Sequence, residues 1–145
     1  MKSYFTDFYE VMKENLNNSN KDYEKFIDHA PDIFKLLTEI LSQKKVDPII
    51  RLKISAALAY FVAPYDVISE QVYGPMGYID DIFISVYVLK DVEDDLGFGN
   101  LQSIWDGDEE LKTVIEKCYD KSVEFLGNRT DEIIRYVGLD YLIEI

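Results

Sequence analysis

The stretch between residues 64 and 81 constrains the fold of this chain more than any other feature. It joins two strongly apolar segments, 54–62 and 82–89, and contains two prolines and two glycines. Proline and glycine interrupt helices, so the stretch predicts a corner between two buried elements. The same stretch carries four carboxylates, those of Asp66, Glu70, Asp80 and Asp81. Acids between two core segments require an explanation.

Helical periodicity predicts the rest of the architecture. Apolar residues recur every three or four positions over 4–16, 32–43, 49–62, 79–92 and about 109–126, with shorter candidates at 21–30, 101–105 and 130–137. Segment 82–89 is rich in β-branched residues, which also suit a strand, but no other segment offers it a strand partner. We therefore expect an all-α fold, a single compact helical bundle of about six or seven helices spanning 1–145, with a central apolar helix hairpin.

Turn and cap residues predict the ends of these helices. Pro31 suits the first turn of a helix, and Gly127 and Gly138 suit helix ends. Polar loops are expected at 17–20 and 44–48, and an irregular acidic linker at 93–100. Asp108 is the predicted N-cap of the long helix that follows.

Charge and cysteine content exclude several functional classes. With 28 acids against 15 bases, the net charge of −13 argues against nucleic acid and anionic lipid as partners. It favours solubility, which is the simplest interpretation, or else a divalent cation or a basic protein partner. One cysteine allows no internal disulfide and no zinc cluster. The apolar segments are shorter than the ~20 residues that span a bilayer, and the N-terminus lacks a signal-peptide core, so we expect no membrane span and a cytoplasmic location.

The corner also carries a family resemblance. It rests on the run Leu58-Ala59-Tyr60-Phe61-Val62-Ala63-Pro64-Tyr65-Asp66-Val67-Ile68-Ser69-Glu70, followed by Gly77-Tyr78-Ile79-Asp80-Asp81. This pattern resembles the YkvA-like family, a domain of unknown function, over about 31–92, with 1–30 and 93–145 as helical flanks. Ser69 stands where the family usually has proline, and Glu70 where it has aspartate. The resemblance implies a helical domain and an acidic motif, but no activity.

Two interpretations of the acids remain open. In the first they fix the corner: Asp66 caps a short turn, Asp80 and Asp81 stabilise the next helix start, and tyrosine hydroxyls donate to them. Tyr60, Tyr65, Tyr73 and Tyr78 are the candidate donors. In the second, Asp66, Glu70, Asp80 and Asp81 converge on Ca²⁺ or Mg²⁺, which prefer oxygen ligands.

Catalytic groups are otherwise scarce. His29 is expected at a helix end and Cys118 in the core, and no phosphate-binding glycine loop or nucleophile motif is present. The leading hypothesis is a non-enzymatic protein-protein interaction module, for example an antitoxin or immunity protein that covers a basic partner. A metal-dependent hydrolase that uses the four carboxylates is the alternative. A homodimer is a further expectation.

Overall fold

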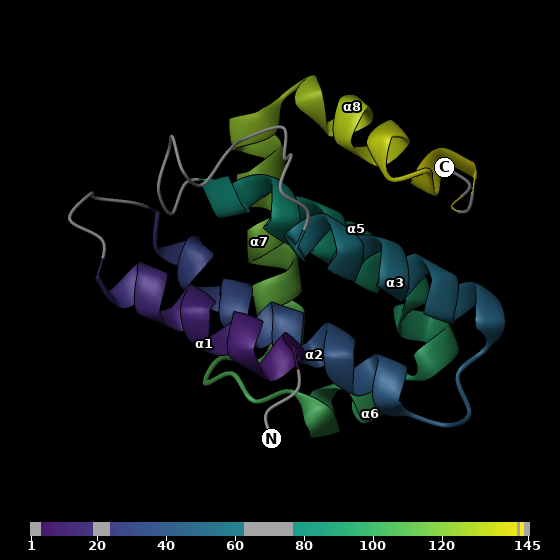
Figure 1. Cartoon of the computed structure of the whole chain (residues 1–145). Coiled ribbons are helices and arrows are strands. Elements are labelled where there is room, and N and C mark those ends of the chain that lie inside the picture. The colour runs from purple at the N-terminus through teal and green to yellow at the C-terminus, as the bar shows by residue number, and fades with distance from the viewer. Residues whose placement is uncertain (1–3, 19–23, 63–76, 142, 144–145) are drawn as a thin grey trace.

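The chain is helical throughout the part that the structure describes. This computed structural model describes residues 4–18, 24–62, 77–141 and 143 (Figure 1). Within those ranges there are seven α-helices, two short 3-10 helices and no strand. They are α1 (Tyr4–Asn17), η1 (Lys25–His29), α2 (Ala30–Ser42), α3 (Pro48–Val62), α5 (Ile79–Leu96), α6 (Phe98–Ile104), α7 (Leu111–Leu126), α8 (Arg129–Tyr136) and η3 (Leu139–Tyr141). The all-α prediction is confirmed.

Helix α5 is the centre of the molecule. It packs against α2, α3, α6, α7 and α8, and α7 crosses it in Figure 1. Its first eight residues are all buried, and Val88, Leu89 and Val92 continue the buried face in its second half. A helix in contact with neighbours on every side needs an almost continuous apolar sequence, which explains the run of β-branched residues in 82–89. The central position of α5 therefore resolves the helix-or-strand ambiguity.

Helices α3 and α5 form the predicted hairpin. The Lys53 ammonium lies 2.6 Å from a carboxylate oxygen of Asp91, and the Tyr60 hydroxyl lies 2.8 Å from one of Asp80. The residue that is later in α3 therefore contacts the residue that is earlier in α5, which means that the two helices run antiparallel. Both belong to one continuous hydrophobic core.

Aromatic contacts join the N-terminal helices to this hairpin. The Phe8 and Phe34 rings are 5.0 Å apart between α1 and α2, and Phe34 meets Phe61 of α3 edge-on at 5.3 Å. Such pairs add about 0.5–1.5 kcal/mol beyond the burial of their surface. Met12 of α1 is fully buried against this core. Within the described ranges, no helix is both long and apolar enough to cross a bilayer.

The prediction of an irregular linker at 93–100 is wrong. Residues 93–96 continue α5, and Gly97, with φ of +84°, separates it from α6. Val92 is buried and Leu96 partly buried on the core side, while Asp94 and Asp95 face solvent. Packing of the apolar side chains thus extends the helix through an acidic segment whose local composition predicts a loop.

The N-cap assigned to Asp108 is also wrong. The residue before α7 is Glu110, and no side chain of its own segment caps the helix. Instead the Leu111 N–H donates to the side-chain oxygen of Gln102 at 3.0 Å, so α6 supplies the acceptor. A cap from another helix leaves no local sequence signal.

Other predicted helix boundaries are close to those observed. Pro31 lies in the first turn of α2, and Gly127 (φ +54°) and Gly138 (φ +77°) follow helix ends. The helix expected at 21–30 is the shorter η1. Asn17 still belongs to α1, and the rest of the loop expected at 17–20 lies partly outside the described residues.

Candidate functional site

The acidic corner places two carboxylates inside the protein. Asp80 and Asp81 are the second and third residues of α5, and both are fully buried. The Tyr60 hydroxyl donates to Asp80 Oδ2 at 2.8 Å, and the Asp81 N–H donates to Asp80 Oδ1 at 3.0 Å. The hydroxyl of Ser85 donates to the Asp81 carbonyl at 2.8 Å. A buried carboxylate is tolerated where hydrogen bonds replace its lost water, as they do at Asp80.

This geometry agrees with a fixing role for Asp80. A carboxylate in the first helical turn also complements the positive end of the helix dipole. Neither Asp80 nor Asp81 is the N-cap, a position held by Tyr78. The Tyr78 hydroxyl accepts a hydrogen bond of 3.2 Å from the Asn15 amide, so the same corner is joined to α1. Of the four tyrosines expected to serve as donors, Tyr60 does so; Tyr65 and Tyr73 lie outside the described residues.

The other two predicted metal ligands, Asp66 and Glu70, also lie outside the described residues. Over the ranges that are described, no three histidine, cysteine or acidic side chains come together to hold a metal ion. Asp80 and Asp81 alone supply too few oxygens for Ca²⁺, which takes six to eight. The four-carboxylate site therefore stays a prediction.

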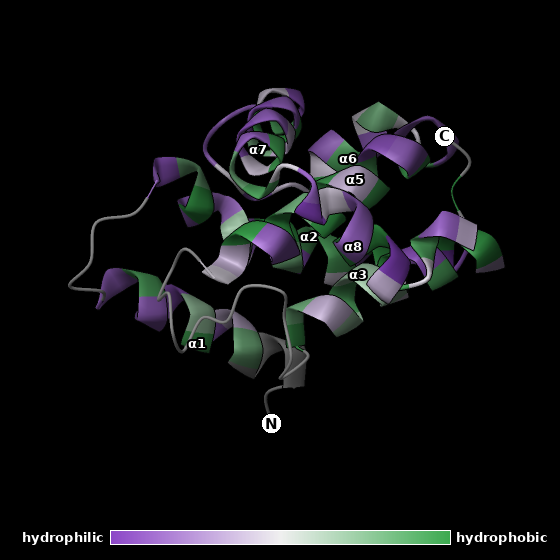
Figure 2. Cartoon of the chain, turned by 90° about the horizontal axis from the view of Figure 1, so that it is seen from above, coloured by the Kyte–Doolittle hydropathy of each residue, from purple (hydrophilic) through white to green (hydrophobic). Residues whose placement is uncertain are grey.

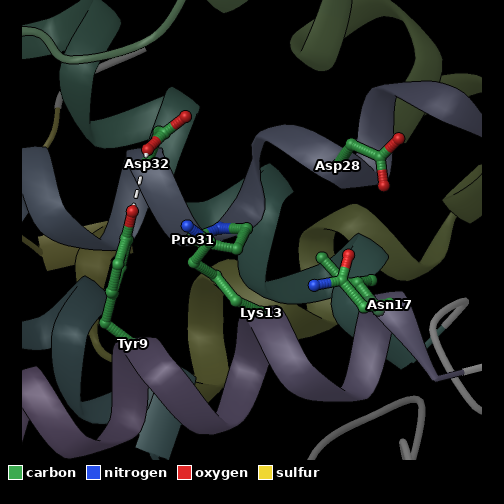
Figure 3. A pocket seen from close by; sticks show the side chains of 7 residues that line it. Tyr9, Lys13, Asn17, Asp28, Pro31 and Asp32 are labelled. Carbon is green, nitrogen blue, oxygen red and sulfur yellow. Dashed lines mark hydrogen bonds between the residues drawn. The ribbon is translucent and has the colours of Figure 1, made fainter.

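A second group of acids lies at a groove between α1 and the η1–α2 segment (Figure 3). The groove has a volume of about 280 Å³. One wall carries Tyr9, Lys13 and Asn17 from a single face of α1, and the other carries Asp28 and Asp32. Leu16 and Pro31 complete the lining and are buried. The groove combines an apolar base with charged and hydrogen-bonding side chains.

Exposure distinguishes these acids from those at the corner. Asp28 is exposed and Asp32 is half-buried. The Tyr9 hydroxyl donates to Asp32 Oδ1 over a long 3.4 Å, drawn as a dashed line in Figure 3. The ammonium of Lys13 lies 5.3 Å from the centroid of the Tyr9 ring, and that of Lys35 lies 5.8 Å from it. The groove therefore brings carboxylates, a tyrosine hydroxyl and a lysine ammonium together at the protein surface.

Sequence reasoning missed this groove. Tyr9 and Asp32 are 23 residues apart, and each reads locally as an ordinary helix residue. The one available signal is the position of Asp28 and Asp32 on successive turns, either side of Pro31. Only the packing of α1 against α2 brings Tyr9 to them.

The histidine and the cysteine lie where the sequence predicts. His29 ends η1, and its Nε2 is 2.9 Å from a carboxylate oxygen of Glu109. Cys118 is fully buried on α7, and burial raises the pKa of its thiol to about 12. A thiol with such a pKa is no nucleophile at neutral pH.

Comparison with known proteins decides the family. The model of a family described as "Protein of unknown function (DUF1232)", the YkvA-like family, matches residues 50–87. Over 132 residues the chain is 35% identical to "Uncharacterized protein ORF9" of Methanothermobacter thermautotrophicus, covering 91% of this chain and 90% of that protein. The chain belongs to the DUF1232 family.

The DUF1232 match runs from Ile50 in α3 to Tyr87 in α5. It therefore includes the Tyr60–Asp80 contact, whereas every residue that lines the α1–α2 groove precedes it. No solved structure matches the chain significantly.

Proposed function

We propose that this DUF1232 protein is a non-enzymatic module that binds a protein partner through a basic segment. The observation that carries the proposal is the open α1–α2 groove, where Asp28 and Asp32 line one wall. A lysine or arginine side chain of the partner enters this groove, and its apolar stem packs on Leu16 and Pro31. Its charged end meets the two carboxylates.

Two further features support a basic partner. The chain carries a net charge of −13, which attracts a basic protein and speeds its encounter. Tyr9 adds a ring and a hydroxyl to the groove, a combination common at protein interfaces. An antitoxin or immunity protein that covers a basic toxin is one form of this function.

Capture from native cell extract tests the proposal with variants that change the groove. We expect wild-type protein to retain a basic partner, and the double variant Asp28→Asn, Asp32→Asn to lose it. Asp131→Asn with Glu132→Gln is the matched control, because it removes the same charge from exposed positions on α8. Loss in both double variants would reduce the effect to net charge and contradict a groove site.

Lys13 gives a test of the sign of the ligand's charge. If a cationic side chain binds, Lys13→Gln removes a nearby like charge and leaves partner retention unchanged or stronger. Loss of the partner in Lys13→Gln would instead indicate an acidic ligand, and the proposal would fail.

Divalent-cation binding at the corner is a second candidate. It is favoured by the burial of two neighbouring carboxylates, Asp80 and Asp81, at the α5 end of the connection that carries Asp66 and Glu70. A metal-dependent hydrolase is its enzymatic form. Titration calorimetry with Ca²⁺, Mg²⁺ and Mn²⁺ tests it: binding by the wild type that is lost in Asp66→Asn would support it, and no heat in the wild type would exclude it.

A further inference from the structure

Lys35 of α2 lies beside the α1–α2 groove and has two aspartates within its reach. Its ammonium is 5.8 Å from the centroid of the Tyr9 ring, which lines the groove. Asp32, three residues earlier on α2, is the nearer acid in the sequence, yet Lys35 forms its ion pair with Asp106, in the 105–110 segment between α6 and α7. Side chains at positions i and i+3 of a helix are neighbours on its surface, and an ion pair is favoured when the acid comes first. Asp106 and Asp32 therefore compete for the same ammonium.

The outcome of this competition decides the charge of the groove. The described residues that line it include two acids, Asp28 and Asp32, and one base, Lys13, so its formal charge is negative. Figure 2 shows hydrophilic positions interleaved with hydrophobic ones along α1, the helix that supplies Lys13 and Tyr9. If Lys35 turned to Asp32, a second ammonium would balance the second acid. The groove would then be neutral and would no longer attract a cationic side chain.

The segment that carries Asp106 is attached to the body of the protein on either side of this residue. Trp105 is buried, and its indole N–H donates to the Glu109 carbonyl at 2.8 Å. A carboxylate oxygen of Glu109 lies 2.9 Å from Nε2 of His29, at the end of η1. A Cβ at Gly107 would collide with the Trp105 ring, so the backbone passes tightly over the indole. These contacts hold Asp106 at a defined place beside α2.

We propose that Asp106 is a positioning residue for the groove: it holds the Lys35 ammonium away from Asp32 and so leaves that carboxylate to a cationic side chain of the partner. This inference rests on the proposed function. Asp106 also raises the pKa of Lys35 above its ordinary value of 10.5, first of all through the hydrogen bond that it accepts. The contact with Asp106 is thus the main electrostatic interaction of this lysine.

The partner of the Lys35 ammonium can be measured without a ligand. Scalar couplings across hydrogen bonds in NMR spectra join a lysine ammonium nitrogen to the carboxyl carbon of the group that accepts from it. We expect a coupling from Lys35 to Asp106 in the wild type, and a coupling from Lys35 to Asp32 in its place in Asp106→Asn. A coupling to Asp32 already in the wild type, or a coupling to Glu39 in the variant, would overturn the proposal.

Titration with N-acetyl-lysine methylamide, a single lysine whose only charge is its ammonium, tests the consequence for binding. NMR shifts of the backbone amides along the groove report the dissociation constant. Asp106→Asn should raise this constant about threefold, because an ion pair of ordinary strength between positions i and i+3 then competes for Asp32. Asp106→Asn with Lys35→Gln should restore the wild-type affinity, since the competing ammonium is gone. Asp108→Asn is the matched control, because it removes the same charge from an exposed position of the same segment.

The variants separate the role of Asp106 from the proposed function of the groove. Equal weakening in Asp106→Asn and Asp108→Asn would reduce the effect to net charge and overturn the role of Asp106, and so would a failure of Lys35→Gln to restore binding. A wild type that does not bind the lysine probe would contradict the proposed function and, with it, the role of Asp106 in binding. In that case the Lys35 couplings still tell whether the exchange of ion pairs itself occurs.

Discussion

The corner and the groove use the same chemistry in opposite surroundings. At each, a tyrosine hydroxyl donates to an aspartate: Tyr60 to Asp80 over 2.8 Å in the buried corner, and Tyr9 to Asp32 over 3.4 Å in the open groove. Only the first carboxylate is fully buried. Removing a hydrogen bond costs more where water cannot replace it. We therefore assign Asp80 to stability and, under the proposed function, Asp32 to recognition.

The largest difference is expected from removing the carboxylates. Asp80→Ala should lower the free energy of unfolding by about 3 kcal/mol, because the buried Tyr60 hydroxyl loses its acceptor and α5 an acid of its first turn. Asp32→Ala should cost about 0.5 kcal/mol or less, since solvent reaches that site. Urea denaturation measures both. Equal losses would remove the distinction between the two sites.

The stability of the protein at alkaline pH tests the burial of another ionisable group, the thiol of Cys118. Burial raises the pKa of Cys118 from 9.0 to about 12, so the folded chain holds this proton where the unfolded chain releases it. Its contribution to stability is complete below pH 9 and is lost as the pH rises toward 12. At about 1.4 kcal/mol per pH unit, roughly 2 kcal/mol is gone by pH ~10.5.

The variant Cys118→Ala isolates this effect from the titration of the tyrosines. Its free energy of unfolding should fall less steeply than that of the wild type between pH 9 and 11. Parallel curves for the two proteins would mean that the thiol titrates normally in the folded state.

Removing one tyrosine hydroxyl at each site should give a smaller difference in stability than removing the carboxylates. Tyr60→Phe should destabilise the protein by about 1.5 kcal/mol, the cost of a buried hydrogen bond to a charged group. Tyr9→Phe removes a longer bond at a half-buried ring and should cost about 0.5 kcal/mol or less. Thermal unfolding of the pair under one set of conditions measures the difference. A larger loss in Tyr9→Phe would reverse our assignment.

The smallest stability effect is expected from the groove acids together. Asp28→Asn with Asp32→Asn should change the free energy of unfolding by no more than about 0.5 kcal/mol, as at most surface sites. Chemical denaturation of this double variant provides the measurement. A strong destabilisation would mean that the groove acids support the fold.

Much of the fold follows from the sequence because amphipathic spacing is a local property. The 3.6-residue period predicts α1, α2, α3, α5 and α7 within a few residues. The errors arise where distant contacts override local preference. Residues 93–96 stay helical because Val92 and Leu96 pack inward, and the N–H of Leu111 is capped by Gln102 rather than by Asp108.

The site was predictable only in part, for the same reason. The sequence indicates that Asp80 begins a helix and that Tyr60 is among its candidate donors, because both belong to one recognisable motif. It does not indicate that α1 lies beside Asp32, since that depends on Phe8 packing against Phe34. A groove between two helices is a product of tertiary packing, and no single segment encodes it.

Trp105 gives the protein a built-in optical reporter. It is the chain's one tryptophan, is 7% exposed, and donates from its indole N–H to the Glu109 carbonyl at 2.8 Å. The ring lies so close to Gly107 that a Cβ there would come within 2.3 Å of it. Its fluorescence should therefore be blue-shifted in the native state and shift to the red only when the α6–α7 region opens. Because the Trp105 ring does not line the α1–α2 groove, its emission reports unfolding of the protein separately from ligand binding at the groove.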